Sequence, residues 1–126
     1  MNNVTIPQGY NQVMPYLIMA DAEAFLQFTQ KVFGAQEKYK EMRNEKTIRH
    51  AEVRIGDSVI MFAQSTYEFT PQPAGIFIYV NDADAVFQKA LQEGAKEIMK
   101  PEDLSYGRSG GVHDPFGNTW WITSVK

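Results

Sequence analysis

The stretch HAEVR, residues 50–54, contains the side chains best suited to acid–base chemistry. In it, His50, Glu52 and Arg54 alternate with two apolar residues. Because successive side chains of a strand point to opposite faces, the three polar residues should share one face of a sheet. Histidine titrates near neutral pH, so His50 could act as a general base while Glu52 orients its ring. A polar cross-strand ladder on a partly solvated sheet face is the other interpretation of the same pattern.

A second candidate group lies in the glycine-rich stretch SYGRSGG, residues 105–111. The planar guanidinium of Arg108, beside Tyr106, could reach a cavity mouth and hold a substrate carboxylate or phosphate. A surface ion pair or a contact between subunits would account for the same arginine. The flanking glycines indicate either a mobile lid or a tight turn.

Aromatic residues form the third candidate group. In DPFGNTWWI, near the C-terminus, a turn signature leads directly into two adjacent tryptophans. On a strand one of them must face the core, and we expect this to be Trp120, which leaves Trp121 on the other face. The same alternation in GIFIYV places Phe77 and Tyr79 opposite the helix-covered face, and Tyr16 is their counterpart in the first half of the chain. These rings suit a pocket for a flat or hydrophobic ligand.

Composition indicates a single soluble domain. A chain of 126 residues can bury one hydrophobic core. A formal net charge of −3 with scattered lysines and arginines offers no cationic surface for nucleic acid. The longest apolar run, VMPYLIMA, is too short to span a bilayer, and the N-terminus has no secretory pattern. The sequence contains no cysteine, so we expect a cytoplasmic protein without disulfides. From the charge and the apolar runs, we expect neither a nucleic-acid nor a membrane partner.

The two halves of the chain repeat one design. Residues 18–40 are similar to residues 79–100, with Asp21 matching Asp82 and a one-residue gap at the end of the predicted helix. Each half begins with a short apolar strand, continues with the apolar stripe of an amphipathic helix, and ends with three more strand patterns. Two prolines and a glycine between the halves mark a joint.

This organisation predicts an α+β fold. Two tandem βαβββ modules should form a curved, mostly antiparallel sheet around a concave cavity, because each helix covers only one face of its sheet. We expect a single domain over residues 1–126, with module one at about 13–65, a linker at 66–74 and module two at about 75–124.

These tandem units resemble the vicinal-oxygen-chelate superfamily. The resemblance is carried by HAEVRIGDSVIMF in the first half, by DPFGNTWWI in the second, and by the Gly-Ala pair after each helix. The superfamily includes glyoxalase I, bleomycin-resistance proteins and extradiol ring-cleaving dioxygenases. The stretch SYGRSGGVHDPFGNTWW is most similar to a bacterial glyoxalase-like group, although one acidic residue between Gly107 and Arg108 is missing. Such scaffolds host lyases, isomerases, dioxygenases and drug binders alike.

The resemblance also places the superfamily's metal ligands on particular residues. They fall on Met14, on Met61 (or Ile60 if the register slips by one), on Gly75 and on Trp121. A thioether, a hydrogen atom and an indole offer no donor that a divalent cation would accept. We therefore expect neither a metal nor another cofactor.

A metal site built from His50, Glu52 and His113 is an alternative outside the superfamily's positions. These residues would have to converge from two strands, and their spacing alone does not define a tetrahedral site.

The leading hypothesis is a protein that binds a small organic molecule in an aromatic-lined cavity, as bleomycin-resistance proteins do. The acidic balance of the chain mildly favours a cationic ligand. There are two alternatives. One is a metal-independent isomerase or lyase with His50 as its base, and the other is a metal-dependent lyase or dioxygenase. The resemblance implies a homodimer whose subunits complete each other's cavities. We expect the ligand to contact Met14, Tyr16, His50, Glu52, Arg54, Met61, Phe77, Tyr79, Tyr106, Arg108 and Trp121.

Overall fold

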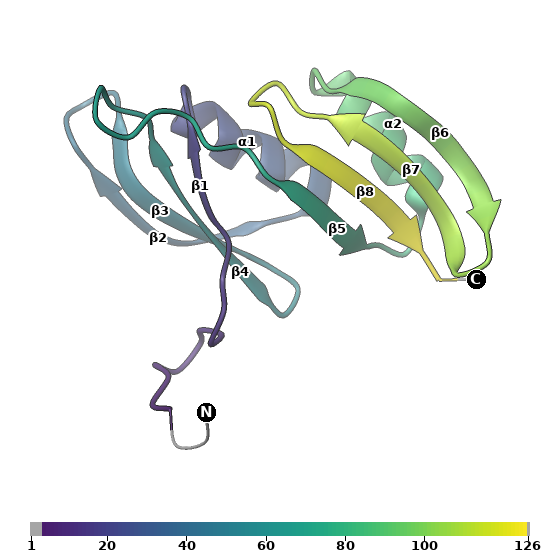
Figure 1. Cartoon of the computed structure of the whole chain (residues 1–126), viewed down its shortest axis with the longest axis horizontal. Helices are drawn as coiled ribbons and strands as arrows, with labels where there is room; N and C mark the ends of the chain where they lie inside the picture. The colour runs from purple at the N-terminus through teal and green to yellow at the C-terminus, as the bar shows by residue number, and fades with distance from the viewer. Residues whose placement is uncertain (1–3, 126) are drawn as a thin grey trace.

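The chain folds as two successive βαβββ modules (Figure 1). The computed structural model describes residues 4–125, so residues 1–3 and 126, the ends of the predicted domain, lie outside it. The first module consists of β1 (Tyr16–Met19), α1 (Ala22–Phe33), β2 (Gln36–Met42), β3 (Ile48–Ile55) and β4 (Ser58–Gln64). The second consists of β5 (Gly75–Tyr79), α2 (Ala83–Gln92), β6 (Lys96–Leu104), β7 (Gly107–His113) and β8 (Thr119–Ser124). The predicted fold class is confirmed.

Each module contains its own four-stranded sheet. The strand orders are β1-β4-β3-β2 and β5-β8-β7-β6, and in each sheet one parallel pair accompanies two antiparallel pairs. The modules lie side by side along the long axis of the molecule, and both helices lie behind their sheets in Figure 1. The front faces of the sheets, which we call the concave faces, therefore have no helix over them.

Both helices start and end where the sequence specifies. The side chain of Asp21 accepts a hydrogen bond from the Ala24 amide at 3.0 Å, and Asp82 accepts one from Ala85 at 3.1 Å. Gly34 follows α1 with φ +68°, a left-handed conformation that glycine adopts without strain. Neither helix is long and apolar enough to cross a membrane, over the residues that the structure describes.

Two strands differ in length from their predicted patterns. The pattern VMPYLIM predicts a longer first strand, but β1 begins at Tyr16, directly after Pro15, whose carbonyl accepts the Met61 amide. The pattern KEIMK predicts a shorter third strand in module two, but β6 continues to Leu104. It passes through Pro101 because β6 is an edge strand with a register shift at that point.

The DPFGN turn has a structural role. The buried carboxylate of Asp114 accepts hydrogen bonds from the Phe116 amide, from the amide and side chain of Asn118, and from Trp120 Nε1 at 2.8 Å. Trp120 is fully buried, and its ring lies 4.4 Å from the ring of Phe33 between centroids. One carboxylate thus holds the turn closed and satisfies an indole in the core.

Candidate functional site

The concave face of the first module carries a row of hydrogen-bonded side chains, which we call the polar chain. Its members are Tyr16, His50, Glu52 and Tyr10. His50 Nε2 lies 2.7 Å from Glu52 Oε2, and the Tyr16 hydroxyl lies 3.2 Å from His50 Nδ1. If Nε2–H donates to the carboxylate, Nδ1 of a neutral ring is left as the acceptor for Tyr16. The basic nitrogen of His50 is then the one that faces the Tyr16 hydroxyl.

Glu52 is the buried centre of this chain. Its side chain is 8% exposed and also accepts a hydrogen bond from the Tyr10 hydroxyl at 2.6 Å. Burial raises the pKa of Glu52, but the hydrogen bonds from Tyr10 and His50 outweigh it, so that the pKa lies below its ordinary value. The hydrogen bond to Glu52 raises the pKa of Tyr10 in turn. Glu52 is therefore held as a carboxylate beneath the histidine.

Tyr10 and its neighbour Lys38 also belong to this site, although they were not predicted from the sequence. The ammonium group of Lys38 lies 4.3 Å from the centre of the Tyr10 ring, within cation–π range. Arg54 donates to the Gly9 carbonyl at 3.4 Å, so this predicted residue helps hold the N-terminal segment on the concave face. The contact between Tyr10 and Glu52 joins positions 42 residues apart, and no periodic pattern in the sequence signals it.

The concave face of the second module is aromatic. The Phe77 ring lies 5.1 Å from the Tyr79 ring and 6.2 Å from the Tyr106 ring, between centroids. Phe77 pairs with Trp121 across β5 and β8, and Trp120 faces the opposite, buried side, as alternation predicts. A Cβ placed on Gly111 would lie 2.4 Å from Trp121 Cζ3, so the indole lies closely over this glycine. We refer to Phe77, Tyr79, Tyr106 and Trp121 as the aromatic wall.

Arg108 does not belong to this wall, which corrects its expected position at the cavity mouth. Its guanidinium forms a bidentate pair with Asp84 on α2, at 2.6 and 3.1 Å, and also contacts Asp103 at 3.2 Å. Because β7 already begins at Gly107, Arg108 follows strand alternation and shares the helix-covered face with the buried Val112. The surface ion pair, the alternative interpretation of this residue, is what the structure contains.

The residues at the superfamily's metal positions do not fit a metal ion. Met61 lies between Tyr16 and Glu52 in the first sheet, and Gly75 and Trp121 lie on neighbouring strands of the second. Their thioether, hydrogen and indole groups are poor donors for a divalent cation, as is the thioether of Met14. His113 contacts Thr119 and does not join His50 and Glu52, and residues 4–125 contain no cluster of three or more potential metal ligands.

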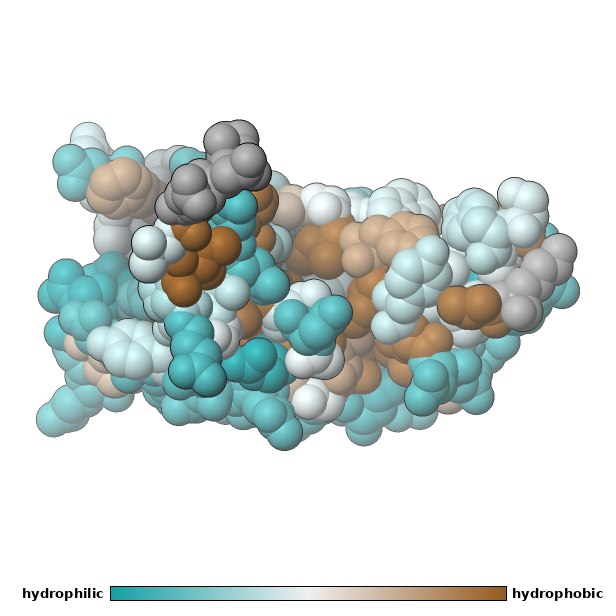
Figure 2. All heavy atoms as spheres, turned by 90° about the horizontal axis from the view of Figure 1, so that it is seen from below, coloured by the Kyte–Doolittle hydropathy of each residue, from teal (hydrophilic) through white to brown (hydrophobic). Residues whose placement is uncertain are grey.

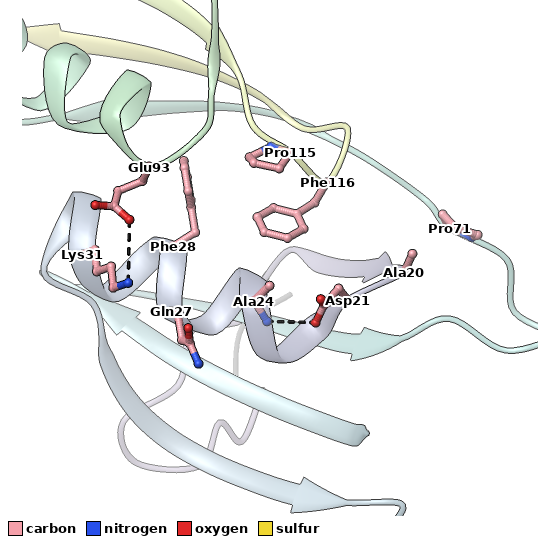
Figure 3. Close-up of a pocket in the computed structure, with 10 residues that line it drawn as sticks. All are labelled: Ala20, Asp21, Ala24, Gln27, Phe28, Lys31, Pro71, Glu93, Pro115 and Phe116. Atoms are coloured by element: carbon pink, nitrogen blue, oxygen red, sulfur yellow. Dashed lines mark hydrogen bonds and ion pairs between the residues drawn. The ribbon is translucent and has the colours of Figure 1, made fainter. Parts of the chain in front are cut away.

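One hollow of the molecule is partly lined by Phe77 and Tyr79 of the aromatic wall, and a second lies on the helix side. A groove of about 770 Å³ separates the modules, and Figure 2 shows apolar residues gathered in it. The groove is lined in part by Ile76, Ile78 and Val80 of the edge strand β5 and the residue after it, which also pack against the core. The face of β5 that was predicted to lie under the helix is therefore only partly covered. Figure 3 shows a pocket between α1 and the β7–β8 turn, where Lys31 pairs with Glu93 and the Phe116 ring meets the Phe28 ring edge-on. No predicted ligand contact lines the latter pocket.

Comparison with known families identifies the class of protein that this fold and site define. The model of the Glyoxalase/Bleomycin resistance protein/Dioxygenase superfamily matches residues 9–122, and the chain belongs to this family. Curated relatives include the uncharacterized protein Mb0911c of Mycobacterium bovis, which is 33% identical over 118 residues, 84% of this chain and 78% of the relative. The uncharacterized protein Rv0887c of Mycobacterium tuberculosis is equally similar, with 69% of its length covered.

Solved structures share the fold. TioX from Micromonospora sp. ML1 has a TM-score of 0.76 at 20% identity, covering 92% of this chain and 99% of its own. A glyoxalase/bleomycin resistance protein/dioxygenase family enzyme from Burkholderia phytofirmans PsJN has a TM-score of 0.71 at 24% identity. The match covers 88% of this chain and 95% of that enzyme. The fosfomycin resistance protein FosX from Mesorhizobium loti has a TM-score of 0.68 at 19% identity, covering 96% and 95%. At these identities the similarity establishes the fold and not the ligand.

Proposed function

We propose that this protein binds a small organic molecule with an aromatic or apolar body against the aromatic wall. The exposure of the wall supports this proposal: Phe77 is 47%, Tyr106 51% and Tyr79 62% exposed, although the Phe77 ring lies beside both tyrosine rings. Three adjacent exposed rings cost free energy in water, which a ligand or a partner would recover. The polar side chains around His50, brought opposite the wall by a second copy, would orient the ligand.

The proposed site is completed by a second copy of the chain. The two concave faces lie side by side on one chain and do not close over each other (Figure 1). One face is polar and ionisable, and the other is aromatic, so the two would form complementary walls if the first module of one copy faced the second module of another. A homodimer would enclose two such cavities by symmetry.

A thermal-shift screen tests the binding proposal. Aromatic acids, aromatic alcohols, drugs and thiol adducts are added to the wild-type protein and to Tyr79→Ala. A ligand at a hundredfold its Kd should stabilise the wild type by about 2.7 kcal/mol, and the variant should lose most of this gain. Tyr67→Ala is the matched control because Tyr67 is fully exposed outside the wall. If no compound stabilises the wild type, or if both variants respond as it does, the proposal is wrong.

A second candidate function is metal-independent isomerisation or elimination next to a carbonyl group. The 2.7 Å contact between His50 and Glu52 favours it, because a buried carboxylate that holds an imidazole would stabilise the imidazolium formed when His50 takes a proton. His50→Ala should then abolish turnover of a compound found in the screen while the thermal shift by that compound persists. Loss of both would assign His50 a structural role instead.

A further inference from the structure

A pocket of about 520 Å³ lies at one end of the concave face of the first module. Its floor is made by Tyr16, Ile18 and Ala63 of the sheet. The segment between β4 and β5 forms one wall, where Gln72 bridges to Ile18 and Phe69 bonds back to Thr66. The opposite wall comes from the β2–β3 connection, which reaches the same end of the sheet (Figure 1). The volume suits a small ligand.

Within residues 4–125, the only charged residues that line this pocket are two arginines. Arg43 and Arg49 flank the turn between β2 and β3, and the Arg43 amide donates to the Thr47 carbonyl at 2.8 Å. Arg49 adjoins a register shift between β2 and β3 at which Glu41 pairs with His50 and Met42 with Ile48. This irregularity leaves one extra residue on β3, and Arg49 lines the same face as Tyr16 and Ile18.

Both guanidinium groups are available to a ligand. Arg49 Nε lies 3.5 Å from Glu41 Oε2, but both side chains are about half exposed, and such pairs contribute little. Arg43 forms no ion pair with any residue in the range 4–125. Glu68 lines a neighbouring hollow together with both arginines, but it does not line the pocket itself.

We infer that the ligand of the concave face is an organic anion, whose carboxylate, sulfonate or phosphonate group binds between Arg43 and Arg49. Guanidinium groups bind such oxyanions through charge-assisted hydrogen bonds. One side of the ligand's apolar body would lie on Ile18, Ala63 and the Tyr16 ring, next to His50 Nδ1, and its other side would face the aromatic wall of a second copy. This inference rests on the proposed binding function, and it replaces the cationic ligand that the overall acidic charge favours with an anionic one.

Two fluorescent dyes that differ in one charged group test the inference. Anilinonaphthalene sulfonate is an aromatic anion, and N-phenylnaphthylamine is its neutral counterpart. Wild-type protein should bind the anion more tightly, and Arg43→Gln/Arg49→Gln should weaken anion binding about tenfold or more while neutral-dye binding stays unchanged. Lys31→Gln/Lys89→Gln is the control, since it removes the same charge from two lysines that pair with Glu93 on the helix side.

The outcomes separate this inference from the proposed function. If the arginine and lysine variants weaken anion binding equally, or if neither weakens it, the anion site is wrong, although neutral-dye binding to the wall would still stand. If neither dye shows saturable binding to the wild-type protein, both the inference and the proposed function are wrong. Anion binding that weakens with added salt only in proteins that retain both arginines supports the site.

Discussion

The Trp121 indole lies over Gly111, its cross-strand partner on β7, so closely that a methyl group there would lie 2.4 Å from Cζ3 and 2.7 Å from Cε3. Because Gly111 has no side chain, it leaves room for the Trp121 indole of the aromatic wall. Gly111→Ala should displace the indole or shift the strand, at a cost of about 1–3 kcal/mol in the free energy of unfolding. Urea denaturation measures this cost.

The control for that prediction is Gly75→Ala, on the edge strand β5. A Cβ at Gly75 would meet no atom within 4 Å, so this change should leave the free energy of unfolding nearly unchanged. Equal stability of the two variants would mean that Trp121 does not lie where the structure places it.

The second prediction concerns Asp114, which accepts a hydrogen bond from Trp120 in the core. Each carboxylate oxygen of Asp114 accepts two hydrogen bonds. Asp114→Asn replaces one of these oxygens with an amide NH₂, which cannot accept them. This change should cost about 2–3 kcal/mol, because a buried donor loses its acceptor. Thermal unfolding measures the loss, and a fully stable variant would contradict the described role of the DPFGN turn.

The third prediction concerns pH. Because hydrogen bonds lower the pKa of Glu52 in the folded state, its stabilising effect is fully present above the unfolded pKa and is lost as the pH falls through the folded pKa. Glu52→Gln should be about 1–2 kcal/mol less stable than wild type at neutral pH. This difference should shrink below about pH 4, as measured by urea denaturation at several pH values. A difference that grows on acidification would contradict the bonding around Glu52.

Strand alternation explains how much of the site could be predicted from the sequence. The opposite faces of Trp120 and Trp121, and the shared face of Phe77 and Tyr79, follow from local geometry and are confirmed. The same rule would have placed Arg108 correctly, but the glycines around it suggest a loop where a strand begins.

Other features depend on long-range structure. Tyr10 reaches Glu52 through a segment without a regular pattern, and the register shift beside Arg49 depends on how β2 and β3 pair. Neither leaves a periodic signal in the sequence, so the polar chain could be predicted only in part and the arginine pocket not at all.

The fourth prediction concerns assembly. If a second copy covers the concave faces, the wild type should sediment as a dimer, and Phe77→Lys should weaken the dimer at least tenfold by placing a charge in an apolar interface. Analytical ultracentrifugation over a range of concentrations measures this. Val13→Lys, at a residue 85% exposed before β1, is the matched control. If the wild type is monomeric, the proposal that a second copy closes the cavity is wrong.

The two tryptophans offer the most direct test of the aromatic wall, because one indole N–H is bonded to Asp114 in the core and the other belongs to the concave face. Two-dimensional proton–nitrogen NMR resolves both indole signals, and Trp121→Phe assigns them. On titration with N-phenylnaphthylamine, the Trp121 signal should shift saturably while the Trp120 signal stays in place. A shift confined to Trp120, or saturable dye binding that leaves Trp121 unmoved, would contradict this prediction.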